Sequence, residues 1–263
     1  MTRRRLDTEL VRRKLVPSRS AARAVIDEGR VRVRGNPSPK PSTMVAPEDP
    51  LSIEGPPPRF VGRAGEKLDA ALDAFRVDVR GRSAIDVGAS TGGFTDCLLQ
   101  RGATRVVAVD VGYGQIHSRL RDDARVDVVE RTNIRHADPK QLGAPFDLVV
   151  ADLSFISLAL VAGNLASLGG DDADWVLLVK PQFEVGKELV GKGGIVRDPA
   201  THALAIEQAA RALDENGIGV VGVTASPITG AEGNREFLVH GRRTARTIDA
   251  GTVREVVSQE NGP

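Results

Sequence analysis

The sequence has few of the residues that mark disulfide-bonded, metal-binding or membrane-spanning proteins. One cysteine, Cys97, can form neither an internal disulfide nor a cysteine cluster for zinc. The four histidines, at positions 117, 136, 202 and 240, show no ligand spacing, so we predict no metal site. No apolar run approaches the roughly 18 residues that span a bilayer, and the basic start MTRRRLDTEL lacks the apolar core of a secretory signal. These absences predict a soluble cytoplasmic protein that does not act on membranes.

Aromatic residues and net charge are also scarce. Aromatic residues make up 3% of the chain, and base stacking by the segment before Phe60 is not supported. The net charge of +1 hides an asymmetry, because residues 1–63 hold 14 Lys and Arg against 7 Asp and Glu, and the other 200 residues hold 22 against 28. A basic first quarter indicates that this end contacts a polyanion; the alternative is a basic face that only contacts water.

The first quarter has the pattern of a small separate domain. Apolar spacing predicts a helix over residues 6–15, a break at Pro17-Ser18 and a second helix that ends at Gly29. Valines alternate with arginines over 30–34, as in a strand with one apolar and one basic face. Short strands are possible near 44–45 and 51–53. Because Gly55-Pro56-Pro57-Pro58 favours an extended linker, we predict one domain over 1–58 and a second over 59–263.

From Arg63 onward strands alternate with helices, which predicts a Rossmann-like α/β domain with a mostly parallel sheet. The expected strands are residues 84–87, 105–109, 126–129, 147–151, 175–179, 218–225 and 236–243. The expected helices are residues 66–75, 95–101, 116–121, 157–167 and 199–216. Residues 182–198 are rich in glycine and are expected to form an irregular loop.

The strongest single motif is the glycine-rich loop IDVGASTGGF at residues 85–94, between an apolar strand and a helix. Glycines let the backbone approach a ligand closely, and the helix start presents free N–H groups. The next strand ends in Asp110, 24 residues after Asp86, where an acid commonly holds a ribose diol. Packing alone is the alternative reason for such a turn.

A dinucleotide site would need G-x-G-x-x-G, whereas this loop reads D-x-G-x-x-x-G-G. That pattern resembles the methyltransferase motif that binds S-adenosylmethionine. Asn133, after the third strand, is a candidate to hydrogen-bond the adenine amine, although such an asparagine is also a common turn residue. The residues expected to bind the cofactor are Asp86, Gly88, Ala89, Ser90, Thr91, Gly92, Gly93, Phe94, Asp110, Asn133 and Asp152.

Charged residues also stand where the expected strands end, and Asp152 and Lys180 follow apolar strands directly. Burying a lysine amine favours its uncharged form, which can act as a base. Together Lys67, Asp152, Lys180 and Glu236 fit the K-D-K-E tetrad of FtsJ-type ribose 2′-O-methyltransferases. The resemblance implies that Lys180 accepts the proton of the 2′-hydroxyl, that Asp152 orients Lys180 near the sulfonium, and that Glu236 holds Lys67 or the ribose. Structural ion pairs are the alternative.

The segment LVPSRSAARAVIDEGRVRVRG resembles the S4 RNA-binding fold, over roughly residues 3–55. The arginines expected to contact the RNA backbone are Arg4, Arg12, Arg13, Arg19, Arg23 and, after the domain boundary, Arg63. With ADLSFISL and VKPQFEVG around Asp152 and Lys180, residues 3–242 resemble the TlyA family. That resemblance implies methyl transfer from S-adenosylmethionine to the ribose 2′-hydroxyl of a cytidine in 16S or 23S ribosomal RNA, with ribosomal RNA or ribosomal subunits as partners.

Two other functions compete with this one. A non-catalytic RNA-binding protein of ribosome assembly would not need the cofactor, so a cofactor titration separates it. A membrane-active haemolysin is disfavoured because the helix over 199–216 carries Glu207, Asp214 and Glu215 rather than a cationic face. The loop over 182–198 either closes over cofactor or RNA, with Lys187, Lys192 and Arg197 toward phosphate, or is simply mobile. The modified nucleotide and the oligomeric state stay open.

Overall fold

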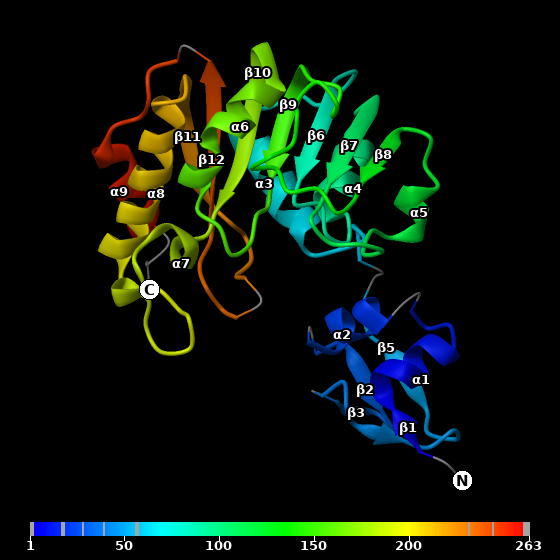
Figure 1. Cartoon of the computed structure of the whole chain (residues 1–263). Coiled ribbons are helices and arrows are strands. Elements are labelled where there is room, and N and C mark those ends of the chain that lie inside the picture. The colour runs from blue at the N-terminus through cyan, green and yellow to red at the C-terminus, as the bar shows by residue number, and fades with distance from the viewer. Residues whose placement is uncertain are drawn as a thin grey trace. The chain divides into compact units, whose positions relative to one another are not determined.

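The computed structural model describes residues 3–16, 19–27, 29–38, 40–55, 58–230, 232–243 and 245–259 (Figure 1). The chain divides into two compact units, residues 1–62 and 63–263. The break expected at Pro17-Ser18 and the middle of the expected linker, Pro56-Pro57, lie outside the described residues. Among the described residues, no helix is long and apolar enough to cross a membrane.

The first unit packs two helices against short strands. Its elements are β1 (Arg4–Arg5), α1 (Leu6–Arg12), α2 (Arg19–Asp27), β2 (Val31–Val33), β3 (Asn36–Pro37), β4 (Met44–Val45) and β5 (Leu51–Ile53). Leu6 and Leu10 lie one turn apart on α1 and are fully buried, in one cluster with Ile26 of α2 and Val31 of β2. Strand β2 lies between β3 and β5 in a three-stranded sheet. The helical and alternating patterns of the sequence therefore form one small core, as predicted.

The basic face expected on β2 is largely paired within the unit. Arg32 forms an ion pair of 2.6 Å with Glu54, and Arg34 forms one of 2.6 Å with Asp49. The Nε atom of Arg30 donates to the backbone carbonyl of Glu54 at 2.7 Å. Arg32 and Arg34 therefore each have an acidic partner that the alternating pattern did not indicate.

The second unit is built on a seven-stranded sheet with the order β11-β12-β10-β9-β6-β7-β8. All neighbouring strands are parallel except for β12, which is antiparallel to both β10 and β11. The strands are β6 (Ser83–Val87), β7 (Arg105–Val109), β8 (Val126–Val129), β9 (Phe146–Ala151), β10 (Gly169–Val179), β11 (Ile218–Ala225) and β12 (Phe237–Arg243). Every strand predicted in this part of the sequence is present.

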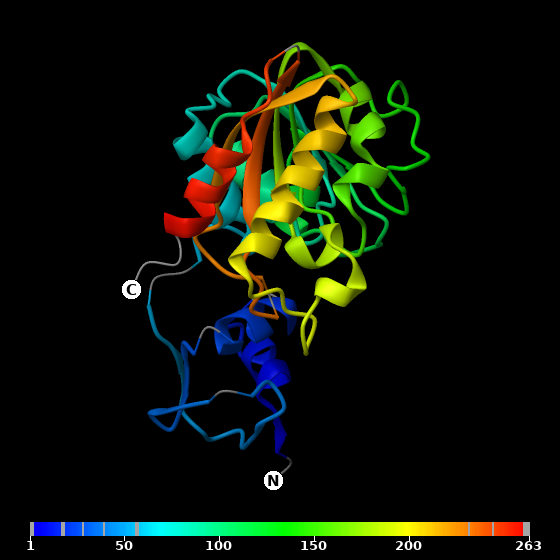
Figure 2. The ribbon, with the colours of Figure 1, turned by 90° about the vertical axis from the view of Figure 1, so that its left-hand side faces the viewer.

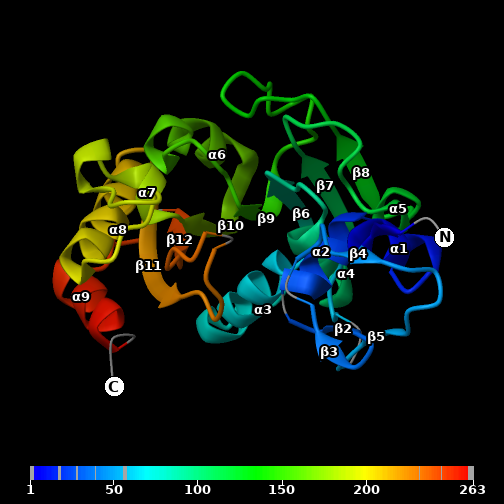
Figure 3. The same ribbon diagram turned by 90° about the horizontal axis from the view of Figure 1, so that it is seen from below.

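Helices cover both faces of this sheet (Figures 2 and 3). Helices α3 and α4 lie together on one face, and α6 and α8 lie on the other. The helical segments are α3 (Ala64–Phe75), α4 (Gly93–Gln100), α5 (Ser118–Arg121), η1 (Leu158–Leu160), α6 (Ala162–Leu168), α7 (Pro181–Glu184), η2 (Lys187–Leu189), α8 (Pro199–Asp214) and α9 (Ala250–Gln259). The helix predicted over 157–167 is therefore split into η1 and α6, and the loop predicted over 182–198 contains two short helical turns.

The central strands are buried on both faces, as expected of a parallel sheet covered by helices. In β10, Trp175, Val176, Leu177 and Val179 are fully buried, and the indole N–H of Trp175 donates to the carbonyl of Leu165 at 2.9 Å. Because β6, β7, β8, β9 and β10 run in the same direction, their carboxyl ends meet along one edge of the sheet (Figure 1). The loops after these strands are consequently brought together, which is where ligands bind in such sheets.

Candidate active site

The glycine-rich loop after β6 has a backbone shape that requires glycine at two positions. Gly88 has φ +88°, and a Cβ atom there would lie 2.6 Å from the carbonyl oxygen of Asp152. Gly92 has φ +96°, and a Cβ atom there would lie 2.2 Å from a methyl carbon of Leu120. Both the left-handed conformation and the lack of space exclude larger residues. The loop thus approaches the end of β9 closely.

Asp86 of β6 supports this loop from below. Its Oδ2 atom accepts hydrogen bonds from the backbone N–H of Thr95 at 2.9 Å and from the Thr95 hydroxyl at 2.7 Å. Its Oδ1 atom is buried without a hydrogen-bond partner. Burial raises the pKa of Asp86 to about 7; the carboxylates of Asp152 and Asp110 add to the rise, and the bonds from Thr95 oppose it. Asp86 is therefore a poorly satisfied acid beside the loop.

Asp110 follows β7 and closes the other side of the loop. Its two oxygens accept from the backbone N–H of Ser90 at 2.8 Å and of Gly112 at 2.6 Å. Each oxygen retains a second lone pair for a ligand hydroxyl. Asn133 is exposed, and its side-chain oxygen accepts from the N–H of Arg135 at 3.0 Å, which is the turn role considered for it above.

A cavity of about 540 Å³ opens in front of this loop. Five residues expected to hold the cofactor line it, namely Gly88, Ser90, Asp110, Asn133 and Asp152. The other expected residues, Asp86, Ala89, Thr91, Gly92, Gly93 and Phe94, lie beside or beneath the lining. Phe94 is 2% exposed and packs in the core, so its role here is structural. The sequence analysis did not single out Val111, Gln115 or Ile134, which also line this cavity, although Val111 directly follows Asp110.

The four residues of the expected tetrad form two ion pairs. Lys180, at the end of β10, lies 2.5 Å from Asp152 Oδ1, at the end of β9, and donates to the hydroxyl of Ser154 at 2.9 Å. Lys67 of α3 donates to Glu236, which directly precedes β12. Both lysine side chains are 10% exposed, and Glu236 is 4% exposed. Neither lysine amine points away into solvent, and both ion pairs lie at the edge of the sheet where the parallel strands end.

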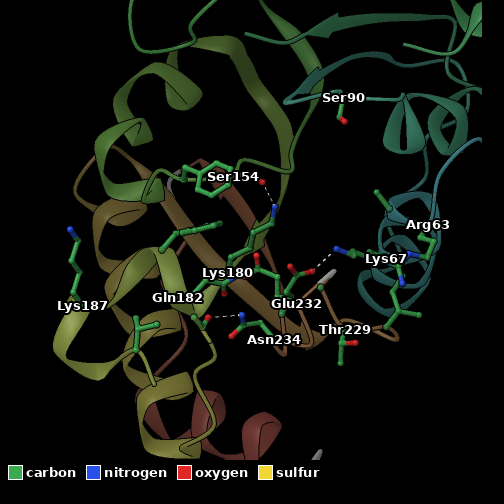
Figure 4. Close-up of a pocket in the computed structure, with 18 residues that line it drawn as sticks. Arg63, Lys67, Ser90, Ser154, Lys180, Gln182, Lys187, Thr229, Glu232 and Asn234 are labelled. Atoms are coloured by element: carbon green, nitrogen blue, oxygen red, sulfur yellow. Dashed lines mark hydrogen bonds and ion pairs between the residues drawn. The ribbon is translucent and has the colours of Figure 1, made fainter. Parts of the chain in front are cut away.

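A second cavity, of about 760 Å³, lies between these ion pairs. Its lining includes Lys67 and Lys180, together with Glu236 and the exposed Arg63. Figure 4 shows Lys67 reaching from α3 toward the middle of the cavity and Lys180 reaching toward Ser154. Three residues, Ser90, Ser154 and Phe155, line both cavities. The pair of Asp152 and Lys180 thus joins the loop cavity to the second cavity.

Phe155 has an unusual conformation at the junction of the two cavities. Its side chain is 90% exposed, and its φ of +64° is rare for a residue other than glycine. The ring stacks in a tilted arrangement on Phe183, 5.2 Å between centroids. An exposed aromatic ring held in a strained backbone at a cavity mouth suits contact with a planar ligand. No pattern in the sequence indicated this conformation.

The arginines expected to bind RNA differ in how free they are. Arg12 and Arg13 pair with the buried Glu9, and Arg19 pairs with the buried Asp7. The bond from Arg12 lowers the pKa of Glu9 to about 2. Arg13 also donates to the carbonyls of Ala46, Pro47 and Asp49, so it ties α1 to the β4–β5 connection. Arg4 and Arg23 are exposed and have no side-chain partner among the described residues.

No group of three or more His, Cys, Asp or Glu side chains that could hold a metal ion is present in the described part of the chain. The arrangement instead offers a glycine-lined cavity for one ligand, a lysine-lined cavity for another, and a carboxylate–amine pair between them. Such a site can transfer a group from the first ligand to the second while the lysine takes up a proton.

The sequence matches two family models, the S4 domain over residues 4–51 and the FtsJ-like methyltransferases over residues 60–243. It is 49% identical to the 16S/23S rRNA (cytidine-2′-O)-methyltransferase TlyA of Mycobacterium tuberculosis, over 97% of this chain and 96% of the relative. It is 37% identical to Hemolysin A of Brachyspira hyodysenteriae, over 90% of this chain and 98% of that protein. A solved structure from Streptococcus thermophilus, named as a hemolysin, matches with a TM-score of 0.79 and 38% identity, over 99% of this chain and 96% of the other.

Proposed function

The chain belongs to the TlyA family, with an S4 domain followed by an FtsJ-like methyltransferase domain, and from this premise we propose that it methylates the ribose 2′-hydroxyl of a cytidine in ribosomal RNA, with S-adenosylmethionine as methyl donor. The observation that carries the proposal is the Asp152–Lys180 ion pair at the wall shared by the two cavities. A base at this place faces both the methyl donor in one cavity and the nucleotide that accepts the methyl group in the other. The competing functions, RNA binding alone or membrane damage, give no reason for that arrangement.

The loop cavity fits the methyl donor. Gly88 lines this cavity and carries no side chain, so a ligand can approach its backbone. Asp110 is placed to accept from the ribose hydroxyls, and the unpartnered Oδ1 of Asp86 marks a site that lacks a hydrogen-bond donor. When bound, S-adenosylmethionine supplies an electrophilic methyl group on a positively charged sulfur. The carboxylate of Asp152, which lines this cavity, complements that positive charge.

The second cavity fits the nucleotide that receives the methyl group. Lys180, once it has lost its own proton, accepts the proton of the 2′-hydroxyl, and Asp152 and Ser154 fix the direction of its amine. Lys67 and Glu236 compensate each other's charge, so we assign Lys67 the role of a positioning group. The exposed ring of Phe155 suits stacking with a base turned out of its helix. Most of the rate gain comes from alignment of the reacting atoms.

Direct evidence would come from incubating the purified full chain with ribosomal RNA and S-adenosylmethionine labelled in its methyl group. We expect label in RNA at a cytidine, in a linkage that resists alkaline cleavage because the 2′-oxygen is blocked. Four substrates are tested side by side: naked 16S RNA, naked 23S RNA, the assembled small subunit and the assembled large subunit. RNA binding without label in any of the four would leave the non-catalytic alternative.

The buried carboxyl of Asp86, beneath the glycine-rich loop, predicts that the stability of the fold depends on pH. Because burial raises the pKa of Asp86 to about 7, its carboxyl is protonated in the folded chain at pH 5 and ionised in an unfolded chain. The Asp86 carboxyl therefore contributes its full stabilisation of the fold below about pH 4, and this contribution is lost as the pH rises through about 7. The free energy of unfolding falls by on the order of 4 kcal/mol over this range. Asp86→Asn, which mimics the protonated acid, should melt close to the unmodified protein at pH 4 and clearly higher at pH 8. Melting curves of the ligand-free proteins measure this, and parallel pH profiles would contradict it.

The unpaired arginines of the S4 domain predict a salt effect on RNA binding. Phosphate contacts release counterions, so replacing Arg4 and Arg23 together by alanine should lower the magnitude of the slope of log affinity against log salt by roughly 1.4 to 2. Arg80→Ala is the control, because Arg80 is exposed in the methyltransferase domain and pairs with Asp78. Binding of ribosomal RNA is measured from low to high salt. An unchanged slope in the double variant would exclude these two arginines as phosphate contacts.

A further inference from the structure

Asn234 is a buried polar residue in the loop between β11 and β12, and the reaction described above does not use it. Its side chain is 1% exposed. Its Nδ2 atom donates to the carbonyl of Gly194 at 2.8 Å, and its Oδ1 atom accepts from the N–H of Val196 at 3.0 Å. One amide thereby satisfies a carbonyl and an N–H on a single segment, as a neighbouring strand would. Figure 4 labels Asn234 and shows the bond to Gly194.

The segment that Asn234 holds is part of a small hairpin in the glycine-rich stretch. Gly191 and Ile195 form an antiparallel bridge, and Gly194 N–H donates back to the Gly191 carbonyl at 3.1 Å. Lys192 lies at the tip of this turn, and Gly193 and Gly194 have φ values of +80° and +76°. Gly194 also lines the second cavity. The hairpin is therefore a wall of the cavity that takes the nucleotide.

The same segment is fixed from its other side by α8. The Nε2 atom of His202 lies 3.0 Å from the carbonyl oxygen of Val196, so it carries the hydrogen of the neutral ring. Burial lowers the pKa of His202, which keeps the ring neutral, and the ring packs against Phe237 at 5.5 Å. Val196 thus has its N–H held by Asn234 and its carbonyl held by His202. The hairpin base is anchored by two buried side chains from two different elements.

The loop that carries Asn234 also carries Glu236. The carbonyl of Asn234 accepts from Gly230 N–H at 2.9 Å, and the carbonyl of Glu236 accepts from Ser226 N–H at 2.9 Å. A Cβ atom on Gly230 would lie 2.6 Å from Glu236 Oε1, so the loop backbone packs directly on this carboxylate. The other oxygen of Glu236 receives Lys67. The position of the carboxylate therefore depends on the loop, and the loop is tied to the hairpin through one amide.

We infer that Asn234 is a positioning residue, which acts through Glu236 to place the Lys67 amine and at the same time fixes the hairpin wall against the incoming nucleotide. This role rests on the proposed methyl transfer. A displacement of about 1 Å at a reacting group can lower a rate by about 100-fold, so the contribution of this one amide is large enough to measure. A residue that served only folding would change stability without changing the rate of the bound complex.

The test measures methyl transfer to ribosomal RNA by the full chain in single turnover, with RNA and S-adenosylmethionine both saturating. Asn234→Ala should lower this rate by about 10- to 100-fold, while the affinity for S-adenosylmethionine stays within about twofold. Asn216→Ala is the matched control, because Asn216 is an exposed asparagine whose amide also donates to a backbone carbonyl, that of Ala212. It should leave the rate unchanged.

A double variant separates positioning through Glu236 from a general loss of structure. If Asn234 acts through Glu236, adding Asn234→Ala to Glu236→Gln should slow transfer by much less than Asn234→Ala slows it in the unmodified chain, and the loss that remains is the contribution of the hairpin wall. Independent losses that multiply, or a variant that only raises the RNA concentration needed for half-maximal rate, would overturn the inference. An unmodified chain that transfers no methyl group would instead overturn the proposed function itself.

A second pair of variants covers the case in which Asn234→Ala does not fold. His202→Gln retains an amide N–H that can donate to the Val196 carbonyl, whereas His202→Ala does not. The glutamine variant should keep the rate within about threefold and the alanine variant should lose about tenfold or more. Equal rates in both would show that anchoring the hairpin does not matter for catalysis.

Discussion

Replacing Lys180 by alanine should slow methyl transfer by about 10²- to 10⁴-fold, the range by which a positioned base accelerates a reaction. The amine of Lys180 is the only side-chain nitrogen that the described residues place against Asp152, at the wall that both cavities share. The affinity for S-adenosylmethionine should change by no more than about threefold, because the loop, Asp110 and Asp152 all remain. Single-turnover transfer and equilibrium binding of the donor measure the two quantities.

A second substitution at the same position distinguishes a base from an ion-pair partner. Lys180→Arg keeps a cation that can pair with Asp152, but a guanidinium does not release its proton in proteins. It should be as inactive as the alanine variant while it unfolds at a temperature closer to that of the unmodified chain, since breaking a buried pair is costly. Lys140→Ala, at an exposed lysine, serves as the control and should be fully active. More than about a tenth of the activity in the arginine variant would rule out proton uptake by Lys180.

Replacing Gly88 by alanine should weaken binding of S-adenosylmethionine by roughly 100-fold, as strain of a few kcal/mol in the bound loop implies. The new Cβ would lie 2.6 Å from the Asp152 carbonyl oxygen and 3.2 Å from a methyl carbon of Leu153. Either the loop or the end of β9 must shift, and both form the loop cavity. Methyl transfer should fall as well, because Asp152 moves with β9. Calorimetric titration with the donor measures the loss.

Gly81→Ala is the matched control for this change. Gly81 has a similar φ of +77°, but no atom lies within 4 Å of a Cβ built there. Alanine at this position pays about 1 kcal/mol of left-handed strain without displacing any neighbour. Donor binding should stay unchanged in Gly81→Ala. If both alanine variants bound the donor equally poorly, the close approach of the loop to β9 would not be the reason.

The order of the secondary structure elements could be predicted because most elements follow from the spacing of apolar residues within a short segment. Strand β9 ends in the apolar run LVVA and β10 in the apolar run WVLLV, and in β2 valines alternate with an arginine. Helix α9 escaped prediction because only Val253 and Val257 of it are buried, which leaves a weak pattern. The two short helical turns within 182–198 were not predicted, because the glycines around them are poor helix formers and interrupt the helical spacing of apolar residues.

Asp152 and Lys180 could be located from the sequence because a parallel sheet brings the carboxyl ends of its strands to one edge, and the resemblance to the tetrad added Lys67 and Glu236. The resemblance implied that Glu236 holds Lys67 or the ribose; the structure pairs it with Lys67, 169 residues away, and that choice depends on side-chain positions. The same dependence on the folded chain applies to Arg32 and Arg34, whose acidic partners, Glu54 and Asp49, lie outside the strands. Asn234 belongs to no recognisable motif, and Ser154 stands in the segment ADLSFISL without a role of its own there; only their contacts in the folded chain identify them.

The wall shared by Ser90, Ser154 and Phe155 has a consequence for inhibitor chemistry. An adenosine analogue seated in one cavity ends beside the neighbouring cavity, so a single compound with an adenosine half and a cytidine half needs only a short tether. Such a compound would block the binding of both substrates at once. Phe155 lies outside the glycine-rich loop, so a contact with its ring would favour binding to enzymes of this kind over other enzymes that use the same methyl donor.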